Sequence, residues 1–373
     1  MEHLRVSMRH IVVDSCSHKC PNIVLVIGES YNKHHSQLYG YKLPTTPKML
    51  DMYRKGDLVV MKDAVTSWNL TSRVFKSMLS THDMKCSGNW TDGVLFPAIM
   101  RKAGYKVAFL TNQFQKSRSQ NGVDFNGSFF LNDAELDTMC FDVRNERGNV
   151  LDGELLHEYD HYVPGKYNFT IFHLYGQHTQ YSCRYDAKHD FFTVDSIKRK
   201  KLNREQRKVV AEYDNATRYN DSVFSVICQK FRDEDAIVVY LSDHGEEVYD
   251  YIKMFGRTPG DVIDAAIAYY EFQIPMVVWF SPKFKERHKD VVKQVKKNCR
   301  SPFFSSNVSQ MIMGLAGVES SWYNPKRDIF SDKYLPSKRY LKGVYSYDSI
   351  LKGTQFAPKK RVKEQKTETR RNK

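Results

Sequence analysis

The stretch that decides the fold is NIVLVIGES at residues 22–30, a short apolar run that ends in glycine and then turns polar. A run of this length, rich in β-branched residues, predicts a strand buried on both faces. Comparable runs recur along the chain, and each predicts a further buried strand. They are KVAFLT at 106–111, FTIFHLY at 169–175, AIVVYLS at 236–242 and PMVVWF at 275–280.

Amphipathic segments lie between these runs, at 94–103 and along the longer stretch 204–232. In the longer stretch the apolar residues recur at the spacing of one helical face. They are Val209, Val210, Tyr213, Val223, Ile227 and Phe231. Alternation of short buried strands with helices predicts an α/β fold, with a mostly parallel central sheet and helices on both faces.

The chain has 373 residues, of which 41% are hydrophobic and 13% aromatic, so it can bury one large core. We expect a lead-in segment at 1–20, one catalytic domain at 21–350 and a basic, disordered tail at 351–373. No run of about 18 apolar residues occurs, and the first residues lack a signal peptide's apolar region. As written, the chain is expected neither to span a membrane nor to direct its own export.

The formal charge of +14 favours anionic partners, among them phospholipid headgroups and phosphorylated glycans. The tail KKRVKEQKTETRRNK carries part of this charge and is either simply solvated or attracted to a membrane surface. Basic and aromatic residues do not interleave as in a nucleic-acid platform, so no nucleic-acid partner is expected. The seven cysteines are odd in number and scattered, and only Cys16 and Cys20 hint at a disulfide or a metal.

Polar side chains that could bind a metal follow three of the predicted strands. Glu29 follows the first strand, His173 and His178 lie at and beyond the end of the third, and Asp243 and His244 follow the fourth. Ligands bind beyond the carboxyl ends of parallel strands, so these residues should gather at one edge of the sheet. Carboxylate and imidazole together suit Zn²⁺, with Mn²⁺ as the alternative. The competing reading is a capped turn at Asp243 and a solvated loop at Glu29.

A candidate nucleophile stands in SWNLTSRVFKSMLS, residues 67–80, where Thr71 occupies the expected start of a helix. A hydroxyl there is often only an N-cap. A helix N-terminus also favours phosphate, however, and a hydroxyl on a metal can become a nucleophile near neutral pH. Asn69, two residues earlier, would orient the phosphate.

The block NIVLVIGESYNKHHSQLYGYKLPTTP at 22–47 resembles the phosphoethanolamine transferases of the alkaline phosphatase and sulfatase superfamily. The resemblance implies an alkaline phosphatase-like fold. It also implies that Glu29, Thr71, Asp243 and His244 are zinc ligands and that Thr71 accepts the phosphoethanolamine group. We therefore expect these four residues to converge at the carboxyl edge of the sheet.

The segment FHLYGQHTQYSCRY at 172–185 is similar to the family's His-x-x-Gly-x-His segment. The resemblance places His173 and His178 at the site as catalytic residues, with His178 contacting substrate or a second zinc. Either histidine would protonate the leaving oxygen or deprotonate the acceptor hydroxyl.

Family resemblance further implies a phosphatidylethanolamine donor, and a lipid A or other lipopolysaccharide-type acceptor. The reaction would occur at the periplasmic face of the inner membrane. The family's N-terminal membrane helices have no counterpart here, so we expect a truncated sequence, a gene fragment or a misplaced start.

One departure from the family pattern concerns EEVYDYIKMFGRTPGD at 246–261. Lipid A-modifying members have a further histidine here, and Phe255 stands near its expected place. We therefore expect one zinc site and leave a second one open. The EEVYD continuation resembles the branch that modifies the lipopolysaccharide core oligosaccharide.

Three other functions compete with this interpretation. A sulfatase would carry Cys/Ser-x-Pro-x-Arg where this chain reads Thr71-Ser72-Arg73-Val74, so sulfate ester hydrolysis is disfavoured. A phosphoglycerol transferase or a related phosphodiesterase would also use a threonine and a divalent cation. A basic binding protein with a structural metal site is the alternative that involves no catalysis.

Overall fold

The computed structural model describes residues 1–84, 88–113, 130–146 and 148–357. The predicted basic tail therefore lies outside the described residues from position 358 onward. Within them, no helix combines the length and the apolar character needed to cross a bilayer. The division into a lead-in, a catalytic domain and a tail stays a prediction.

A seven-stranded sheet forms the centre of the molecule, in the order β3-β11-β8-β2-β7-β5-β6. Neighbours from β8 to β6 pair in parallel, whereas β11 runs antiparallel to both β8 and β3. The prediction of a mostly parallel α/β sheet is confirmed, and the five predicted strands are all present. The strands are β2 Asn22–Gly28, β3 Leu58–Met61, β5 Lys106–Thr111, β6 Val143–Arg144, β7 Asn168–His173, β8 Ala236–Ser242 and β11 Met276–Phe280.

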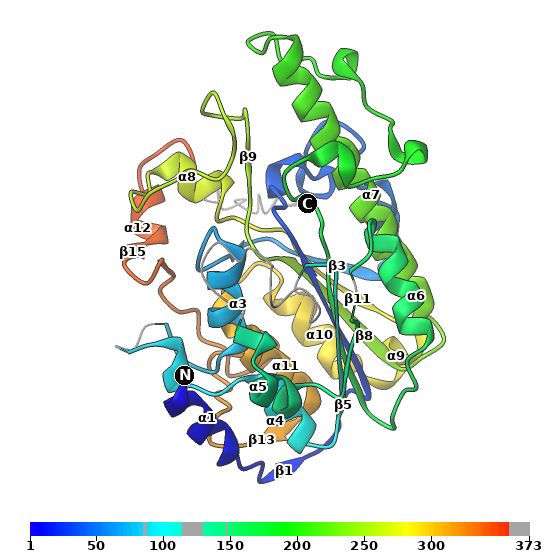
Figure 1. Ribbon diagram of the computed structural model, residues 1–373, viewed down its shortest axis with the longest axis vertical. Coiled ribbons are helices and arrows are strands. Elements are labelled where there is room, and N and C mark those ends of the chain that lie inside the picture. Colours follow the sequence, from blue (N-terminus) through cyan, green and yellow to red (C-terminus); the bar gives the residue numbers. More distant parts are fainter. Residues whose placement is uncertain (85–87, 114–129, 147, 358–373) are drawn as a thin grey trace, which may run out of the picture.

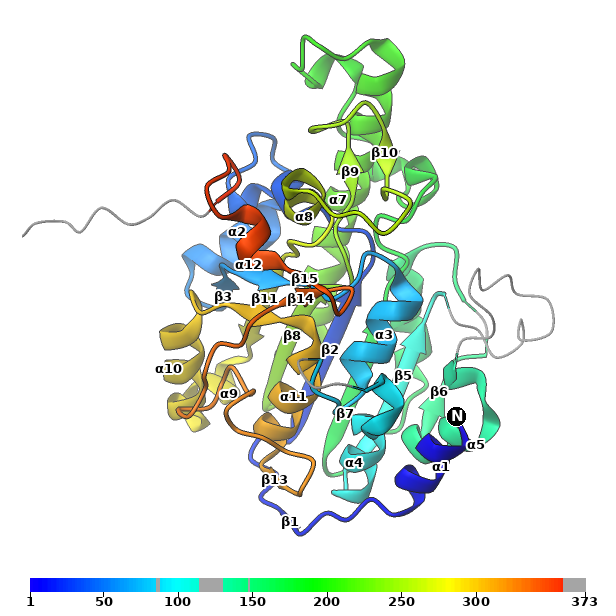
Figure 2. The ribbon, with the colours of Figure 1, turned by 90° about the vertical axis from the view of Figure 1, so that its left-hand side faces the viewer.

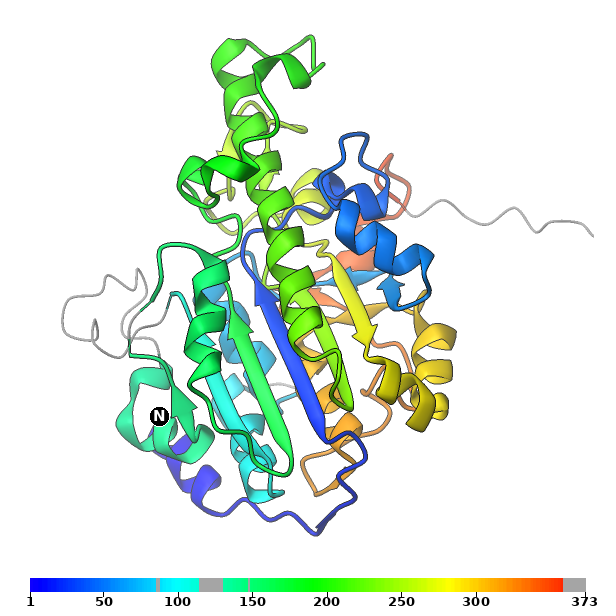
Figure 3. The same ribbon diagram turned by 90° about the vertical axis from the view of Figure 1, so that its right-hand side faces the viewer.

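Helices cover both faces of this sheet, because alternate residues of each central strand point to opposite sides. Ile23 and Leu25 of β2 pack into a core with α1, α3, α4, α5 and α9–α11, while Val24 and Val26 pack with α2, α6 and α7. Figures 2 and 3 show these two layers from opposite sides. The helices of these layers are α1 Glu2–Arg9, α2 Pro47–Arg54, α3 Thr71–Leu79, α4 Phe96–Lys102, α5 Ala134–Cys140, α6 Leu155–Asp160, α7 Arg204–Lys230, α9 Pro282–Arg287, α10 Lys289–Asn298 and α11 Val308–Ala316.

The long helix α7 confirms the amphipathic stretch read from the sequence. Its N-cap is Asn203, whose side chain accepts a hydrogen bond from the Gln206 amide. Its N-terminal half rises beyond the carboxyl ends of the strands (Figure 3), so α7 supports residues above the sheet edge.

Short elements complete the loops around that edge. Two of them matter for the site: the antiparallel pair β9 Glu247–Val248 and β10 Phe255–Gly256, and helix α8 Ala265–Tyr270. The others are α12 Tyr347–Leu351 and the strand pairs β1 Ser15–Cys16 with β13 Val318–Glu319, β4 Ala64–Val65 with β12 Phe303–Phe304, and β14 Tyr340–Leu341 with β15 Tyr345–Ser346.

Candidate metal centre

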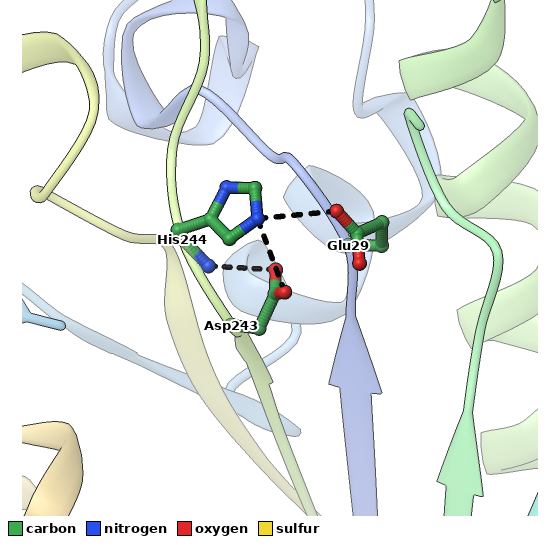
Figure 4. Close-up of side chains that lie close together, drawn as sticks. All are labelled: Glu29, Asp243 and His244. Carbon is green, nitrogen blue, oxygen red and sulfur yellow. Dashed lines mark hydrogen bonds and ion pairs between the residues drawn. The ribbon is translucent and has the colours of Figure 1, made fainter. Parts of the chain in front are cut away.

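Three potential metal ligands meet where β2 and β8 end. The two strands are parallel neighbours with Gly28 opposite Ser242, so Glu29 and Asp243, one residue further along each strand, leave the sheet side by side. Glu29, Asp243 and His244 are fully buried, and one ligand atom from each lies within 4.8 Å of the others (Figure 4). These three residues are called the metal cluster below.

The hydrogen bonds of the metal cluster leave two ligand atoms suited to a cation. His244 Nδ1 donates to the Gly245 carbonyl at 2.8 Å, so Nε2, which faces the two carboxylates, is the ring nitrogen that a cation could bind in place of a proton. Asp243 Oδ2 is buried without a hydrogen-bond partner among the described residues. A buried carboxylate oxygen in that condition is costly unless a cation completes it. The residues present therefore fit a divalent metal with oxygen and nitrogen ligands.

Electrostatics in the metal cluster supports the same conclusion. Burial, reinforced by the Glu29 charge, raises the pKa of Asp243 to about 7. Burial opposes a charge on His244, but the Asp243 and Glu29 carboxylates outweigh it and raise its pKa to about 9. Burial likewise opposes the charge on Glu29, yet His244 holds the pKa of that carboxyl well below its usual value. The cluster thus retains protons near neutrality that a divalent cation would displace.

Thr71 is the first residue of α3, and its hydroxyl points into the metal cluster. Its Oγ1 donates to Glu29 Oε2 at 2.8 Å and lies 3.3 Å from His244 Nε2. The N-cap position of α3 is Leu70, and no side chain caps the helix there. The alternative reading of Thr71 as a helix cap is therefore wrong, and its hydroxyl is turned toward the candidate ligands.

Ser30, which sequence reasoning did not single out, shapes the centre by a strained backbone. Its φ of +55° lies in the left-handed region that non-glycine residues rarely adopt. In this conformation its amide donates to Asp243 Oδ1 at 3.1 Å and its hydroxyl donates to Glu29 Oε1 at 2.7 Å. The Tyr213 hydroxyl on α7 holds the Ser30 carbonyl at 2.6 Å. The Gly-Glu-Ser signature was the only available hint.

His173 lies at the end of β7, and Gln113 lies between it and the metal cluster. Gln113 Nε2 donates to Glu29 Oε2 at 3.0 Å and lies 3.2 Å from His173 Nε2, while His173 Nδ1 is 2.9 Å from the Thr111 hydroxyl. Burial lowers the pKa of His173 to about 3. The neutral histidine thus contacts Gln113, and its predicted catalytic role stays a prediction.

His178 is half-buried in the loop that follows β7. Burial lowers its pKa, and the nearby Glu29 charge opposes the shift. The loop can approach because Gly176 has a φ of +51°, and a Cβ there would lie 2.7 Å from the Glu29 amide nitrogen. Gln177 N donates to the Glu29 carbonyl at 2.9 Å. Glycine is thus required at the centre of the His-x-x-Gly-x-His segment.

Asn69, the predicted phosphate-orienting residue, is buried beside a carboxylate. Its Nδ2 donates to Glu271 Oε2 at 2.7 Å, and the other oxygen of Glu271 accepts from the Thr258 amide at 2.8 Å. Glu271 therefore connects the loop before α3 to the loop after β10. The role of Asn69 toward phosphate stays a prediction.

Arg257 is the main site residue that sequence reasoning missed. Its Nη1 lies 3.0 Å from His244 Nε2 and 3.5 Å from both Glu29 Oε1 and the Ser30 hydroxyl. Phe255, the residue considered for this place, is 41% exposed. The pairing of β10 with β9 directs Arg257 inward, and only its position after Gly256 in the segment could have indicated it.

Comparison with known proteins extends these observations. The sulfatase family profile matches residues 21–318. The chain belongs to the sulfatase family. The resemblance noted from the sequence is thereby confirmed at the level of family and fold.

Phosphoethanolamine transferases are among the proteins similar to this chain. The chain is 27% identical to phosphoethanolamine transferase EptC of Escherichia coli (strain K12), over 91% of this chain and 58% of that protein. It is 28% identical to phosphoethanolamine transferase CptA of Salmonella typhimurium, over 88% of this chain and 56% of that protein. The chain thus spans somewhat more than half the length of these relatives.

A solved structure supports the fold directly. The C-terminal periplasmic domain of EptC from Escherichia coli, in complex with Zn, superposes with a TM-score of 0.78 at 24% identity. The match covers 93% of this chain and 98% of that domain. The likeness confirms the alkaline phosphatase and sulfatase-like architecture.

Proposed function

We propose that this chain is the catalytic domain of a zinc-dependent phosphoethanolamine transferase. The observation that carries the proposal is the Thr71 hydroxyl, 2.8 Å from Glu29 Oε2 and directed into the metal cluster. The names of the similar transferases support the group transferred, and the zinc complex of the similar domain supports the metal. Mn²⁺ is the alternative cation.

Glu29, Asp243, His244 and Thr71 would hold the cation, and its chemistry would be to lower the pKa of the Thr71 hydroxyl and to offset negative charge on phosphoryl oxygens. In the first step Thr71 Oγ1 bonds to the phosphorus of phosphatidylethanolamine, and the bond from phosphorus to the diacylglycerol oxygen breaks. Glu29 Oε2, which already accepts the hydroxyl hydrogen bond, orients Thr71 for this attack. The proton lost by Thr71 is returned to the departing diacylglycerol oxygen.

In the second step an acceptor hydroxyl attacks the same phosphorus, and Thr71 leaves as the free hydroxyl. His178, half-buried and with a lowered pKa, is suited to take the acceptor's proton because its neutral form is favoured. That proton balances the one gained by the departing Thr71 oxygen. The acceptor is a lipopolysaccharide core glycan or lipid A, and the transfer takes place at the periplasmic face of the inner membrane. Similarity to a Kdo(2)-lipid A phosphoethanolamine 7''-transferase of Salmonella typhimurium supports a lipid A acceptor, and similarity to the periplasmic domain of EptC supports a periplasmic location.

The covalent step gives the decisive experiment. The chain is incubated with zinc and phosphatidylethanolamine in detergent, without an acceptor, and its peptides are analysed by mass spectrometry. Because the second step is then limited to slow hydrolysis, one phosphoethanolamine group should accumulate on Thr71. Thr71→Ala should remove the adduct and lower transfer to an acceptor by about a thousandfold or more.

Matched controls are provided by the neighbouring hydroxyls. Ser72→Ala should leave the adduct in place, and Thr71→Ser should retain part of it because a primary hydroxyl still reaches Glu29. An adduct on Ser67 or Ser72, or sustained turnover by Thr71→Ala, would show that the nucleophile is wrong. Absence of any adduct and of lipid turnover in the zinc-loaded chain would favour the binding protein with a structural metal site.

A further inference from the structure

Arg257 and a metal ion would compete for the same lone pair of His244. Since His244 Nδ1 donates to the Gly245 carbonyl, Nε2 is the ring nitrogen left for a cation, which binds it only in its unprotonated form. Arg257 Nη1 lies 3.0 Å from that nitrogen and can donate to the same unprotonated form. The lone pair of Nε2 is also the one that a cation would need. Bound metal and this hydrogen bond are therefore mutually exclusive.

The backbone around Arg257 is held in place on both sides. Gly256 pairs with Glu247 across β9 and β10, and the amide and hydroxyl of Thr258 both donate to Glu271 Oε1, at 2.8 and 2.5 Å. If Arg257 leaves His244, its side chain must therefore move, because the backbone of the loop is held.

Among the described residues, no carboxylate holds the guanidinium at the distance of a strong ion pair. Its ion pair with Glu29 measures 3.5 Å, longer than the 2.7–2.9 Å of a strong charge-assisted bond. The side chain is 22% exposed, so it can turn without breaking the core. A second buried carboxylate, Glu246, has one oxygen bonded to the Tyr181 hydroxyl at 2.6 Å and the other without a partner among the described residues. The Arg257 charge is therefore shared among acidic neighbours rather than paired with one.

We infer that Arg257 caps the metal ligands of the metal-free protein, is displaced from His244 by the cation, and then binds oxygens of the phosphoryl group at Thr71. The first half concerns this chain's metal centre alone, and the second half rests on the proposed function. A planar guanidinium with five donors suits phosphoryl oxygens, and its charge would complement the cation on the opposite side of the group.

Metal affinity tests the capping. The zinc Kd of the full chain is measured by competition with a chelator for the wild type, Arg257→Gln, Arg257→Lys and Arg184→Gln. Arg184 is a matched control: it lies near the site, donating to the His178 and Thr179 carbonyls, and makes none of the hydrogen bonds to the metal cluster. Arg257→Gln should bind zinc about tenfold tighter or more, and Arg184→Gln should stay within about threefold of the wild type.

The variant Arg257→Lys distinguishes the hydrogen bond to His244 from the effect of the positive charge on zinc affinity. It keeps the positive charge but lacks the guanidinium fork, so any tightening reports the lost bond to His244. We expect a zinc affinity between those of the wild type and Arg257→Gln. Equal zinc affinity in the wild type and both Arg257 variants would overturn the capping. If Arg257→Gln fails to fold, the lysine variant decides by the same criterion.

Anion binding tests the second position of the side chain. With zinc-loaded protein, the Kd of free phosphoethanolamine should be about tenfold weaker in Arg257→Gln and unchanged in Arg184→Gln. Equal affinity in all three proteins would overturn the phosphoryl contact. Failure of the proposed transfer reaction would leave the zinc result intact, whereas unchanged zinc and phosphoethanolamine affinities in an active transferase would refute this inference alone.

Discussion

Two buried clusters of this protein contain the same residue types but differ in how completely they are bonded. One is the metal cluster. The other, called the His35 cluster, consists of His35, Asp214, Asp250 and Arg199. His35 Nδ1 lies 2.6 Å from Asp214 and its Nε2 lies 3.1 Å from Asp250, while Arg199 pairs with Asp250 at 2.9 Å. Each cluster thus places a histidine between two carboxylates beside an arginine.

The two clusters differ in how firmly their polar atoms are bonded to partners. In the His35 cluster both ring nitrogens face carboxylates, the Tyr41 hydroxyl bonds the second oxygen of Asp214 at 2.8 Å, and Arg199 supplies a firmly paired cation. In the metal cluster His244 Nε2 faces Glu29 and Asp243 at the longer distances of 3.2 and 3.3 Å, and the ion pair between Arg257 and Glu29 measures 3.5 Å. Asp243 Oδ2 has no hydrogen-bond partner among the residues that the structure describes. Composition alone therefore does not identify a metal site. A buried cluster whose polar atoms are all hydrogen-bonded within the protein stabilises the fold. A buried cluster that leaves a polar atom without a partner indicates a ligand site.

The largest expected effect is the loss of unfolding free energy when one carboxylate of the His35 cluster is removed. Asp214→Asn should lower the free energy of unfolding of the metal-free chain by about 3–5 kcal/mol, because it leaves a buried histidine with one counter-charge fewer. Urea unfolding in the presence of a chelator measures this. Zinc affinity should change by less than about twofold, since the His35 cluster supplies no ligand.

An exposed pair of the same type is the control for that change. Asp186 lies 2.6 Å from His189, but its side chain is 37% exposed. Asp186→Asn should therefore cost less than about 1 kcal/mol. Equal losses of unfolding free energy in the two variants would mean that burial does not determine how much the His35 cluster stabilises the fold.

The reciprocal change acts on the metal cluster and should affect metal rather than stability. Asp243→Asn should weaken zinc binding by about a hundredfold or more, since even supporting residues around a metal contribute 10–100-fold. The metal-free chain should keep its unfolding free energy within about 1 kcal/mol, because the amide oxygen still accepts from Ser30 N and the repulsion from Glu29 is relieved. Unchanged zinc binding would remove Asp243 from the ligand set.

The smallest expected effect is a pH dependence that belongs to the His35 cluster. Burial opposes the charge on His35, but Asp250 and Asp214 outweigh it and raise its pKa to about 9, above the value near 6.5 of an unfolded histidine. The stabilisation by charged His35 is then complete below pH 6.5 and is lost as the pH rises through 9.

Unfolding of the wild type and of His35→Gln, measured across this range, isolates the contribution. The difference in unfolding free energy should shrink by about 1–3 kcal/mol between pH 6.5 and pH 9.5. The metal cluster is common to both proteins and cancels in the difference. A difference that does not vary with pH would show that His35 does not change its charge in this range.

Much of the site could be predicted because parallel strands place distant residues together. Glu29 and Asp243 are far apart in the chain, but each follows an apolar run, and such runs end at one sheet edge. The expected helix start indicated Thr71 as a candidate nucleophile and the family resemblance gave it a role, and the structure brings its hydroxyl to the same point. Gln113 and Arg257 could not be found this way: Gln113 follows β5 by two residues but is part of no motif that indicates a site, and Arg257 follows the two-residue strand β10, which the sequence did not predict.

The sequence by itself determined the α/β class, the strand ends and the residue types at them, because apolar periodicity and strand-end chemistry are local properties. Tertiary structure alone decided that His35 is firmly bonded to its carboxylate partners and that His244 lies in a cluster with an unbonded carboxylate oxygen. It also decided that Arg257, rather than Phe255, faces His244. The reason is physical: hydrogen-bond completion and side-chain direction depend on loops packed from several parts of the chain, and no local pattern encodes that packing.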